Sequence, residues 1–388
     1  MRTVRLRQVG NWVAMAAGAG VGCGQETPAP SPSSTSTSTS ELMPGSKPES
    51  TVKQRNLVAD QAGFARKTDP DLQNAWGIAF RGRSIWITAN HTGTDRQYSE
   101  DGKLGEVITL VDADGMTLAS PTGQVINPFS DAFKGDTFVV ASEDGDIFAA
   151  NPGTPAGAIR IPNEGAAVYK GVAISTFHGA PRLFATDFHN RKVDTFDGDY
   201  APVTPGGAFV DPELATLTED GTTPGEMYAP FNIRRFGDNL LVTFALQKGP
   251  DNDDDDGGPG RGFVDLFDTD GNYLQRLITR GQLNSPWGLD VSVEEKGDLD
   301  LMVGNFGDGH INVYGLSFHP RHVRADFEGA LANRKHEPIA IEGLWGIAFG
   351  SGADDFERSD LYFAAGPGNG EEVETHGLYG EIDFGRRR

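Results

Sequence analysis

The stretch NAWGIAF, residues 74–80, has two near-copies further along the chain: NSPWGLD at residues 284–290 and EGLWGIAF at residues 342–349. Weaker copies are YKGVAI at residues 169–174 and YAPFNI at residues 228–233. Another partial copy, GDTFVVASEDGDIFAANPG from Gly135, lies between the first and the third. Self-similarity that returns every few dozen residues is typical of repeat architectures. The chain therefore contains six copies of one unit.

Each copy is followed by the same order of features. An apolar run after the Gly leads to a second apolar run that ends in a polar residue, then to a Gly-containing turn and a third run. From about Leu57 onward, runs of Val, Ile, Leu, Phe and Tyr alternate with Gly, Asp and Asn, and no long segment has helical periodicity. A unit of roughly 40 to 60 residues with three or four strands is a propeller blade. We therefore predict an all-β fold, a six-bladed β-propeller over residues 56–388.

The repeated phrase itself is expected to begin the innermost strand of each blade. Its Gly would allow neighbouring backbones to approach closely, which a side chain would block. Its Trp would wedge between adjacent blades, with ligand contact at a channel mouth as the alternative. The glycines predicted at close approaches are Gly77, Gly171, Gly288 and Gly346. The asparagines at the start of the first strands would face the channel mouth. The candidate ligand-binding residues are Asn74, Asn232, Asn284, Trp76, Trp287 and Trp345.

The overall charge limits the classes of partner. The chain has 388 residues, 37% of them hydrophobic, and a formal net charge of −22. Such acidity argues against a nucleic-acid partner and against electrostatic binding to anionic lipid. It is explained by solubility, with cation binding as the alternative. We expect a monomer that binds a protein, a glycan or a small molecule.

The N-terminus predicts export. Arg2, Arg5 and Arg7 precede a short apolar run, as in a signal peptide, and the single cysteine, Cys23, follows small residues, as in a lipoprotein lipobox. We therefore predict a signal peptide at residues 1–22, lipidation of Cys23, and a disordered Ser/Thr/Pro-rich tether at residues 23–55. The protein would be a membrane-anchored lipoprotein in the periplasm or at the cell surface. Simple secretion with a chance cysteine, and a cytosolic protein, are the alternatives.

These motifs resemble a known group of proteins. The stretch from Leu283 to Gly315, LNSPWGLDV through GNFGDGHINVYG, looks like an NHL repeat. Together with LFATDFHNRKVDTFDG and GFVDLFDTDGNYLQRL, the repeats resemble an uncharacterised family of exported bacterial β-propellers, many of which carry a PEP-CTERM sorting signal. The C-terminal GEIDFGRRR departs from that pattern because it has no apolar anchor. The resemblance implies the propeller fold but no agreed activity.

Polar residues at the ends of second strands suggest a metal site. In a propeller such positions can lie near the axis, and oxygen ligands from several blades would suit Ca²⁺. His91, His189 and His310 lie close by in sequence, and one of them could act as a general base on metal-bound water. The alternative is that these side chains cap turns. The candidate metal ligands are Asn90, Glu143, Asp187 and Asn305.

The acidic run DNDDDDGG, residues 251–258, is a second candidate for calcium. Asn252, Asp254 and Asp256 match the first half of a calcium-binding loop, but the twelfth position is Phe263 instead of Glu. The alternative is a solvated, self-repelling loop.

Two hypotheses for function follow, and the sequence does not decide whether the protein is an enzyme. The first is a non-catalytic ligand- or protein-binding module at the cell surface or in the periplasm, because no recognisable catalytic motif is present. The second is a Ca²⁺-dependent hydrolase of the lactonase or gluconolactonase type, which rests on analogy of fold.

Overall fold

The computed structural model describes residues 51–385 except 114, 164, 215–226, 294–297, 321, 354–355 and 371. These residues belong to one compact unit, Glu49–Arg388. The predicted signal peptide, Cys23 and the tether up to residue 50 lie outside the described residues and stay predictions. The last three residues of the predicted tether, 53–55, are part of a strand.

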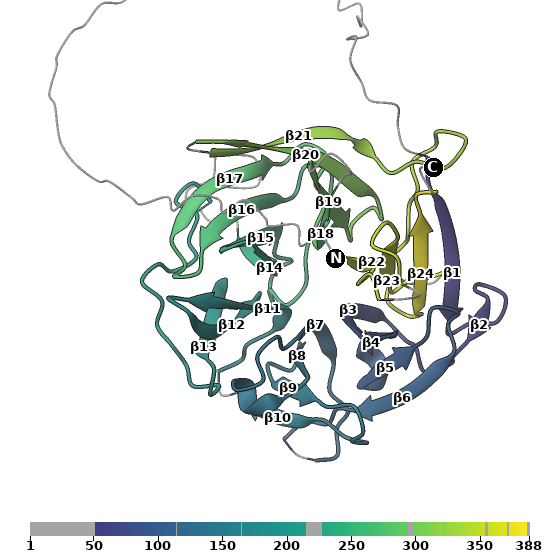
Figure 1. The fold of residues 1–388 in the computed structure, drawn as a ribbon, viewed down its shortest axis with the longest axis horizontal. Coiled ribbons are helices and arrows are strands. Elements are labelled where there is room, and N and C mark those ends of the chain that lie inside the picture. Colours follow the sequence, from purple (N-terminus) through teal and green to yellow (C-terminus); the bar gives the residue numbers. More distant parts are fainter. Residues whose placement is uncertain are drawn as a thin grey trace, which may run out of the picture. The chain divides into compact units, whose positions relative to one another are not determined.

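Six sheets are arranged in a ring, which confirms the all-β, six-bladed propeller (Figure 1). Blade 1 comprises β3 (Ala75–Arg81), β4 (Ser84–Ala89), β5 (Thr94–Tyr98) and β6 (Leu104–Thr109). Blade 2 comprises β7 (Pro121–Ile126), β8 (Phe138–Ser142), β9 (Ile147–Ala150) and β10 (Ala158–Ile161). Blade 3 comprises β11 (Tyr169–Phe177), β12 (Ala180–Asp187) and β13 (Lys192–Asp197). Blade 4 comprises β14 (Tyr228–Phe236), β15 (Asn239–Leu246), β16 (Phe263–Asp268) and β17 (Tyr273–Thr279).

Blade 5 comprises β18 (Pro286–Val293), β19 (Leu299–Asn305), β20 (Ile311–His319) and β21 (His322–Ala330). Blade 6 comprises β22 (Leu344–Phe349), β23 (Leu361–Ala365) and β24 (Leu378–Asp383), joined by β1 (Lys53–Ala59) and β2 (Lys67–Thr68). Two short 3-10 turns, η1 (Asn90–Thr92) and η2 (Phe133–Gly135), are the helical elements within the described ranges. Within those ranges, no helix has the length and apolar character needed to cross a membrane.

The ring is closed by the N-terminal strand. β1 pairs antiparallel with β24, from Lys53 opposite Asp383 to Ala59 opposite Leu378, so the start of the chain completes the last blade. Arg55 reinforces the closure, because its guanidinium donates to Glu381 at 2.5 Å and to Asp383 at 2.6 Å. Both ends of the unit therefore depend on each other for their strand pairing.

The innermost strand of every blade has a register shift in its first half, where it carries one residue more than the strand with which it pairs. In blade 1 the bulge frees the Gly77 N–H, which donates to Thr88 Oγ1 at 2.7 Å, and the Thr88 hydroxyl donates to the Thr122 carbonyl of blade 2. A Cβ on Gly77 would lie 2.5 Å from the Thr122 carbonyl oxygen. The prediction that the glycine of the phrase allows close approach is therefore confirmed.

Two blades depart from the repeated phrase. Blade 2 begins with PTGQVI, which the sequence pattern did not reveal, and Gly123 there faces Gly171 of blade 3. Blade 4 has Asn232 in place of the glycine, and its side-chain amide donates to the Trp287 carbonyl of blade 5 at 2.7 Å. Asn232 is buried in the blade 4–blade 5 contact, so it does not lie at a channel mouth as predicted.

Candidate functional site

The first unpaired residue at each inner-strand bulge occupies one equivalent position around the axis. Three of these side chains, from blades 1, 5 and 6, meet: Trp76 stacks on Trp345 with ring centroids 3.6 Å apart, and Trp287 packs edge-on 6.0 Å from both. All three are buried. They fill the axis of the ring, so the expectation that they wedge between adjacent blades is wrong. The six equivalent residues are Trp76, Thr122, Lys170, Phe231, Trp287 and Trp345.

A second layer of axial residues lies just above, at what we call the channel mouth. In all six blades the residue after the second strand donates its N–H to the carbonyl of the residue before the first strand, as Asn90 does to Asn74 at 3.1 Å. In blade 4 this pair, Gln247 and Met227, lies two residues further from the bulge than in the other blades. Ala245 holds the corresponding position in blade 4, opposite Ala229. Phe188, Phe306 and Ala245 pack with the axial tryptophans. The six mouth residues are Asn90, Glu143, Phe188, Ala245, Phe306 and Gly366.

The four predicted metal ligands divide into two pairs. Asn90 and Glu143 are mouth residues, and Asn90 Nδ2 donates to Glu143 Oε2 at 2.8 Å. Asp187 and Asn305 lie one residue earlier, as the last residues of their strands, and a shift of one residue turns a strand side chain to the other face. Asp187 accepts from Asn190 Nδ2 at 2.8 Å within its own turn, and Asn305 donates to the Gln282 carbonyl at 2.8 Å.

The structure therefore brings two of the four residues together and leaves the other two in contacts within their own blades. Among the residues that the structure describes, no group of three or more His, Cys, Asp or Glu side chains is placed to hold a metal ion.

A chain of polar side chains runs around the mouth and links five blades. Asn74 Nδ2 donates to Glu374 Oε1 at 2.9 Å and to Asn90 Oδ1 at 3.4 Å. From Asn90 the chain continues to Glu143, then to the Lys170 ammonium, which also lies 3.4 Å from Asp254 Oδ1. Asn74 is thus at the mouth, as predicted, and its Oδ1 accepts from the Trp345 indole N–H. Lys170 is the cation of this chain, and Glu143 and Asp254 are its carboxylate partners.

Lys170 is the residue that the sequence analysis missed. It is 1% exposed, its ammonium contacts Glu143, and it lies 5.3 Å from the centre of the Trp76 ring. Burial alone would lower the pKa of Lys170, but Glu143 and Asp254 outweigh it and the pKa lies above its usual value. The ammonium therefore stays charged. It stands beside the axis, where the metal hypothesis expected a cation.

Two carboxyl groups near the mouth are less well compensated. Burial, and then the negative charge of Glu143, raise the pKa of Glu374 to about 7. Glu374 also has a left-handed backbone, with φ of 77°, a conformation that is strained for a side-chain-bearing residue. Burial raises the pKa of Asp255 to about 6. Glu374 is therefore partly protonated at neutral pH.

The acidic loop folds back over the mouth. Three of its carboxylates diverge to different partners: Asp253 to the His189 ring at 2.6 Å, Asp254 to Lys170, and Asp256 to Arg261 at 2.6 Å. Asn252 is tied by its N–H to the Lys248 carbonyl. These three carboxylates do not converge on one point, as the ligands of a calcium loop would. Repulsion persists within the loop, because burial and, in addition, the charge of Asp254 raise the pKa of Asp255.

The remaining candidates lie in separate surroundings. Asn284 precedes its Trp by three residues, whereas Asn74 precedes its Trp by two, so the two asparagines are not equivalent. The Asn284 side chain accepts from the Gly258 N–H at 2.6 Å and holds the end of the acidic loop. Burial lowers the pKa of His91, and His310 lies 3.3 Å from Asp308 in its own turn. No common arrangement of the predicted histidines results.

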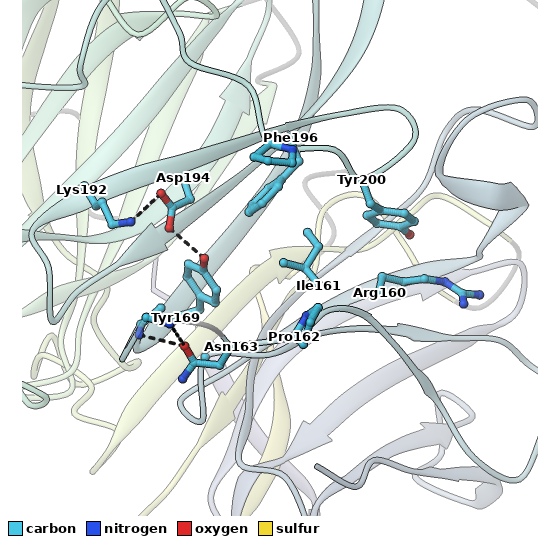
Figure 2. Close-up of a pocket in the computed structure, with 13 residues that line it drawn as sticks. Arg160, Ile161, Pro162, Asn163, Tyr169, Lys192, Asp194, Phe196 and Tyr200 are labelled. Carbon is cyan, nitrogen blue, oxygen red and sulfur yellow. Dashed lines mark hydrogen bonds and ion pairs between the residues drawn. The ribbon is translucent and has the colours of Figure 1, made fainter. Parts of the chain in front are cut away.

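A groove of about 480 Å³ lies between blades 2 and 3. Figure 2 shows Lys192 and Asp194 at one end, Tyr200 and Arg160 at the other, and Ile161 between them. In the described part of the chain, blade 3 has three strands. An isolated bridge between Phe196 and Pro202 covers its outer edge over a short stretch. The groove thus follows the incomplete side of blade 3.

The tyrosines of the groove are held in fixed positions. The Tyr169 hydroxyl donates to Asp194 Oδ2 at 2.8 Å, and the Tyr200 hydroxyl donates to Asp136 Oδ2 at 2.9 Å. Burial, and then the neighbouring carboxylates, raise the pKa of both tyrosines, so they stay protonated donors. No sequence motif indicated this groove, because its walls come from two blades.

Comparison with known proteins found relatives in a virus. The chain is 30% identical over 353 residues to "Uncharacterized protein L690" of Acanthamoeba polyphaga mimivirus, which spans 86% of this chain and 86% of the relative. It is 31% identical over 314 residues to "Uncharacterized protein R648" of the same virus, over 77% of this chain and 74% of the relative. The chain belongs to the family of these two viral proteins. These relatives do not support the bacterial, PEP-CTERM-associated family that the motifs resembled. No family model matches the chain.

Solved structures resemble the chain at low identity. One is virginiamycin B lyase from Staphylococcus aureus, with 14% identity and a TM-score of 0.41, over 86% of this chain and 98% of that one. Another is an auxiliary nutrient binding protein from Bacteroides thetaiotaomicron, with 9% identity and a TM-score of 0.48, over 80% of this chain and 69% of that one. Likeness of this degree carries no argument about function.

Proposed function

We propose that this protein is a non-catalytic binding module whose ligand lies in the groove between blades 2 and 3. The observation that carries the proposal is the groove itself, about 480 Å³ in volume, with apolar walls and polar groups at both ends. Ligand sites usually have about 300 to 1,000 Å³, mostly apolar walls and a few fixed polar groups. Two tyrosines whose hydroxyls are already bonded give the groove a preformed shape.

The surroundings of the axis support binding over hydrolysis. A metal-dependent hydrolase needs several oxygen ligands around one point and an open position for substrate. Here the Lys170 ammonium neutralises Glu143, and the aromatic side chains of Trp76 and Trp345 close the axis below it. In the part of the chain that the structure describes, no group of three or more His, Cys, Asp or Glu side chains could hold the metal of such a hydrolase.

A fluorescent label at the groove tests the proposal. Cys23 is the single cysteine, so a Gly165→Cys variant in a Cys23→Ser background takes one environment-sensitive dye. Gly165 lines the groove, and a Cβ there meets no atom within 4 Å. The same dye at Val210→Cys, a position 53% exposed outside the groove, is the matched control. The probes are defined neutral oligosaccharides, acidic and basic decapeptides, and small organic cations.

We expect a saturable change of the dye signal at position 165 and none at position 210. Equal signals at both positions, or none at position 165 with every probe, would overturn the proposal. The hydrolase alternative has its own readout, the melting temperature in chelator and in millimolar Ca²⁺. A rise with Ca²⁺ that Glu143→Gln abolishes would favour the metal site. Export and lipid anchoring through Cys23 are proposed on the N-terminal residues alone.

A further inference from the structure

Among the described residues of the groove between blades 2 and 3, both cations are already paired with carboxylates. Arg160 bonds Asp136 at 2.6 Å, and Lys192 bonds Asp194 at 2.8 Å and lies 3.5 Å from Asp187. The chain as a whole has a net charge of −22. A charged ligand group would have to displace one of these pairs or lose its own hydration without an unpaired counter-ion, which is costly. The groove therefore favours a neutral ligand.

The walls of the groove are formed largely by apolar and aromatic side chains. Tyr169, Phe196 and Ile161 line it together with the exposed prolines Pro162 and Pro202. Because the hydroxyls of Tyr169 and Tyr200 are bonded to carboxylates, the two tyrosine rings keep their positions and present fixed surfaces. Rigid aromatic and proline surfaces lose little conformational entropy when a flat ligand face covers them.

Polar capacity remains at both ends of the groove. Arg160 uses two of its five N–H donors on Asp136, one from Nε and one from Nη2. Asp194 accepts from Tyr169 and Lys192, and a carboxylate has about four lone-pair sites, so it can accept further hydrogen bonds. A ligand that lies between them can accept at the Arg160 end and donate at the Asp194 end. Hydroxyl groups do both.

From these three features we infer that the groove binds a neutral carbohydrate. A sugar ring has an apolar C–H face for the aromatic and proline surfaces and hydroxyl groups around its edge for Arg160 and Asp194. It carries no charge that would break the two ion pairs. This inference rests on the proposed function, because it names the ligand class of the same groove.

The test is binding of the full chain to an array that carries neutral oligosaccharides, sialylated or sulfated oligosaccharides, and peptides. The strongest binders are then titrated by calorimetry against two variants. Gly165→Trp places a large side chain at the groove, where the glycine has open space and no positive φ. Val210→Trp adds the same bulk at an exposed position elsewhere. Melting temperatures equal to that of the wild type show that neither variant has lost its fold.

We expect a neutral oligosaccharide to bind, with affinity reduced at least tenfold by Gly165→Trp and unchanged by Val210→Trp. If the groove-sensitive ligands are peptides or charged glycans, the groove is a binding site but the carbohydrate inference is overturned. If nothing binds, or if Gly165→Trp leaves binding unchanged, both the inference and the proposed function are overturned. A further variant, Asp194→Asn, should lower the affinity for the neutral oligosaccharide, because an amide accepts fewer hydrogen bonds than a carboxylate.

Discussion

The substitution Asp95→Asn should stabilise the protein at alkaline pH. Asp95 lies on β5, fully buried between blades 1 and 2. Its Oδ1 accepts from Gln124 Nε2 at 3.3 Å, and its Oδ2 has no hydrogen-bond partner among the described residues. Burial raises the pKa of Asp95 from 3.8 to about 7. Asparagine keeps the acceptor for Gln124 and cannot ionise.

The sign and size of the effect follow from proton linkage. The folded state binds the Asp95 proton more tightly than the unfolded state. The contribution of protonated Asp95 to the free energy of unfolding is therefore fully present below pH 3.8 and is lost as the pH rises through about 7. At about 1.36 kcal/mol per pKa unit, the total loss is about 4 kcal/mol. Roughly 2 to 3 kcal/mol of it falls between pH 5 and pH 8.

The assay is urea unfolding followed by tryptophan fluorescence at both pH values. The stability difference between Asp95→Asn and the wild type should grow by that amount in favour of the variant from pH 5 to pH 8. Asp199→Asn, an exposed aspartate, is the control and should change by less than about 0.5 kcal/mol at either pH. Because other buried carboxyl groups titrate in both proteins, their effects cancel in the difference. An Asp95→Asn difference that is the same at both pH values would refute the reasoning.

Three further predictions concern the ring. Gly77→Ala should lower the free energy of unfolding by about 2 to 3 kcal/mol, since its Cβ meets backbone of blade 2, whereas Gly165→Ala should be neutral in the same urea titration. Lys170→Met should cost about 2 to 3 kcal/mol, because it leaves Glu143 without its cation. The double variant with Glu143→Gln should recover at least about 1 kcal/mol, and additive single effects would contradict the pairing. Deleting residues 51–59, which removes β1, should lower the melting temperature by more than about 10 °C and expose dye-binding apolar surface, because blade 6 loses its outer partner.

The fold could be predicted because its signal is local and repeated. Each Gly of the phrase lies where a neighbouring backbone comes so close that a side chain would clash. The same residue therefore recurs in several blades, and the repeat can be recognised in the sequence. Blade 2 was recognised only from its later strands, because Thr122 stands there in place of Trp. The closure of the ring could not be predicted. The contact of Arg55 with Glu381 joins residues 326 positions apart, and neither segment has a sequence pattern that indicates its partner.

The channel mouth was predicted in part, and the error has a simple geometric cause. The sequence offers Asp187 and Asn305 as the polar ends of their strands, but the mouth position is the next residue, which is Phe188 or Phe306. Strand side chains alternate between faces, so an offset of one residue selects the wrong set. The alignment of YKG with AWG did place Lys170 at the Trp position. Its role as a buried cation depends on the ion pair with Glu143, which comes from another blade.

The axis and the groove are joined by two consecutive residues of β11. Lys170 is the bulge residue and points to the axis, whereas Tyr169 before it pairs with Asp187 and lines the groove. A substitution at Lys170 is therefore expected to move Tyr169 as well, since the bulge sets the position of both. Loss of ligand binding in a Lys170 variant would not show that the ligand lies at the channel mouth. Gly165 lines the groove without contacting either residue through a side chain, so a substitution there separates the groove from the axis.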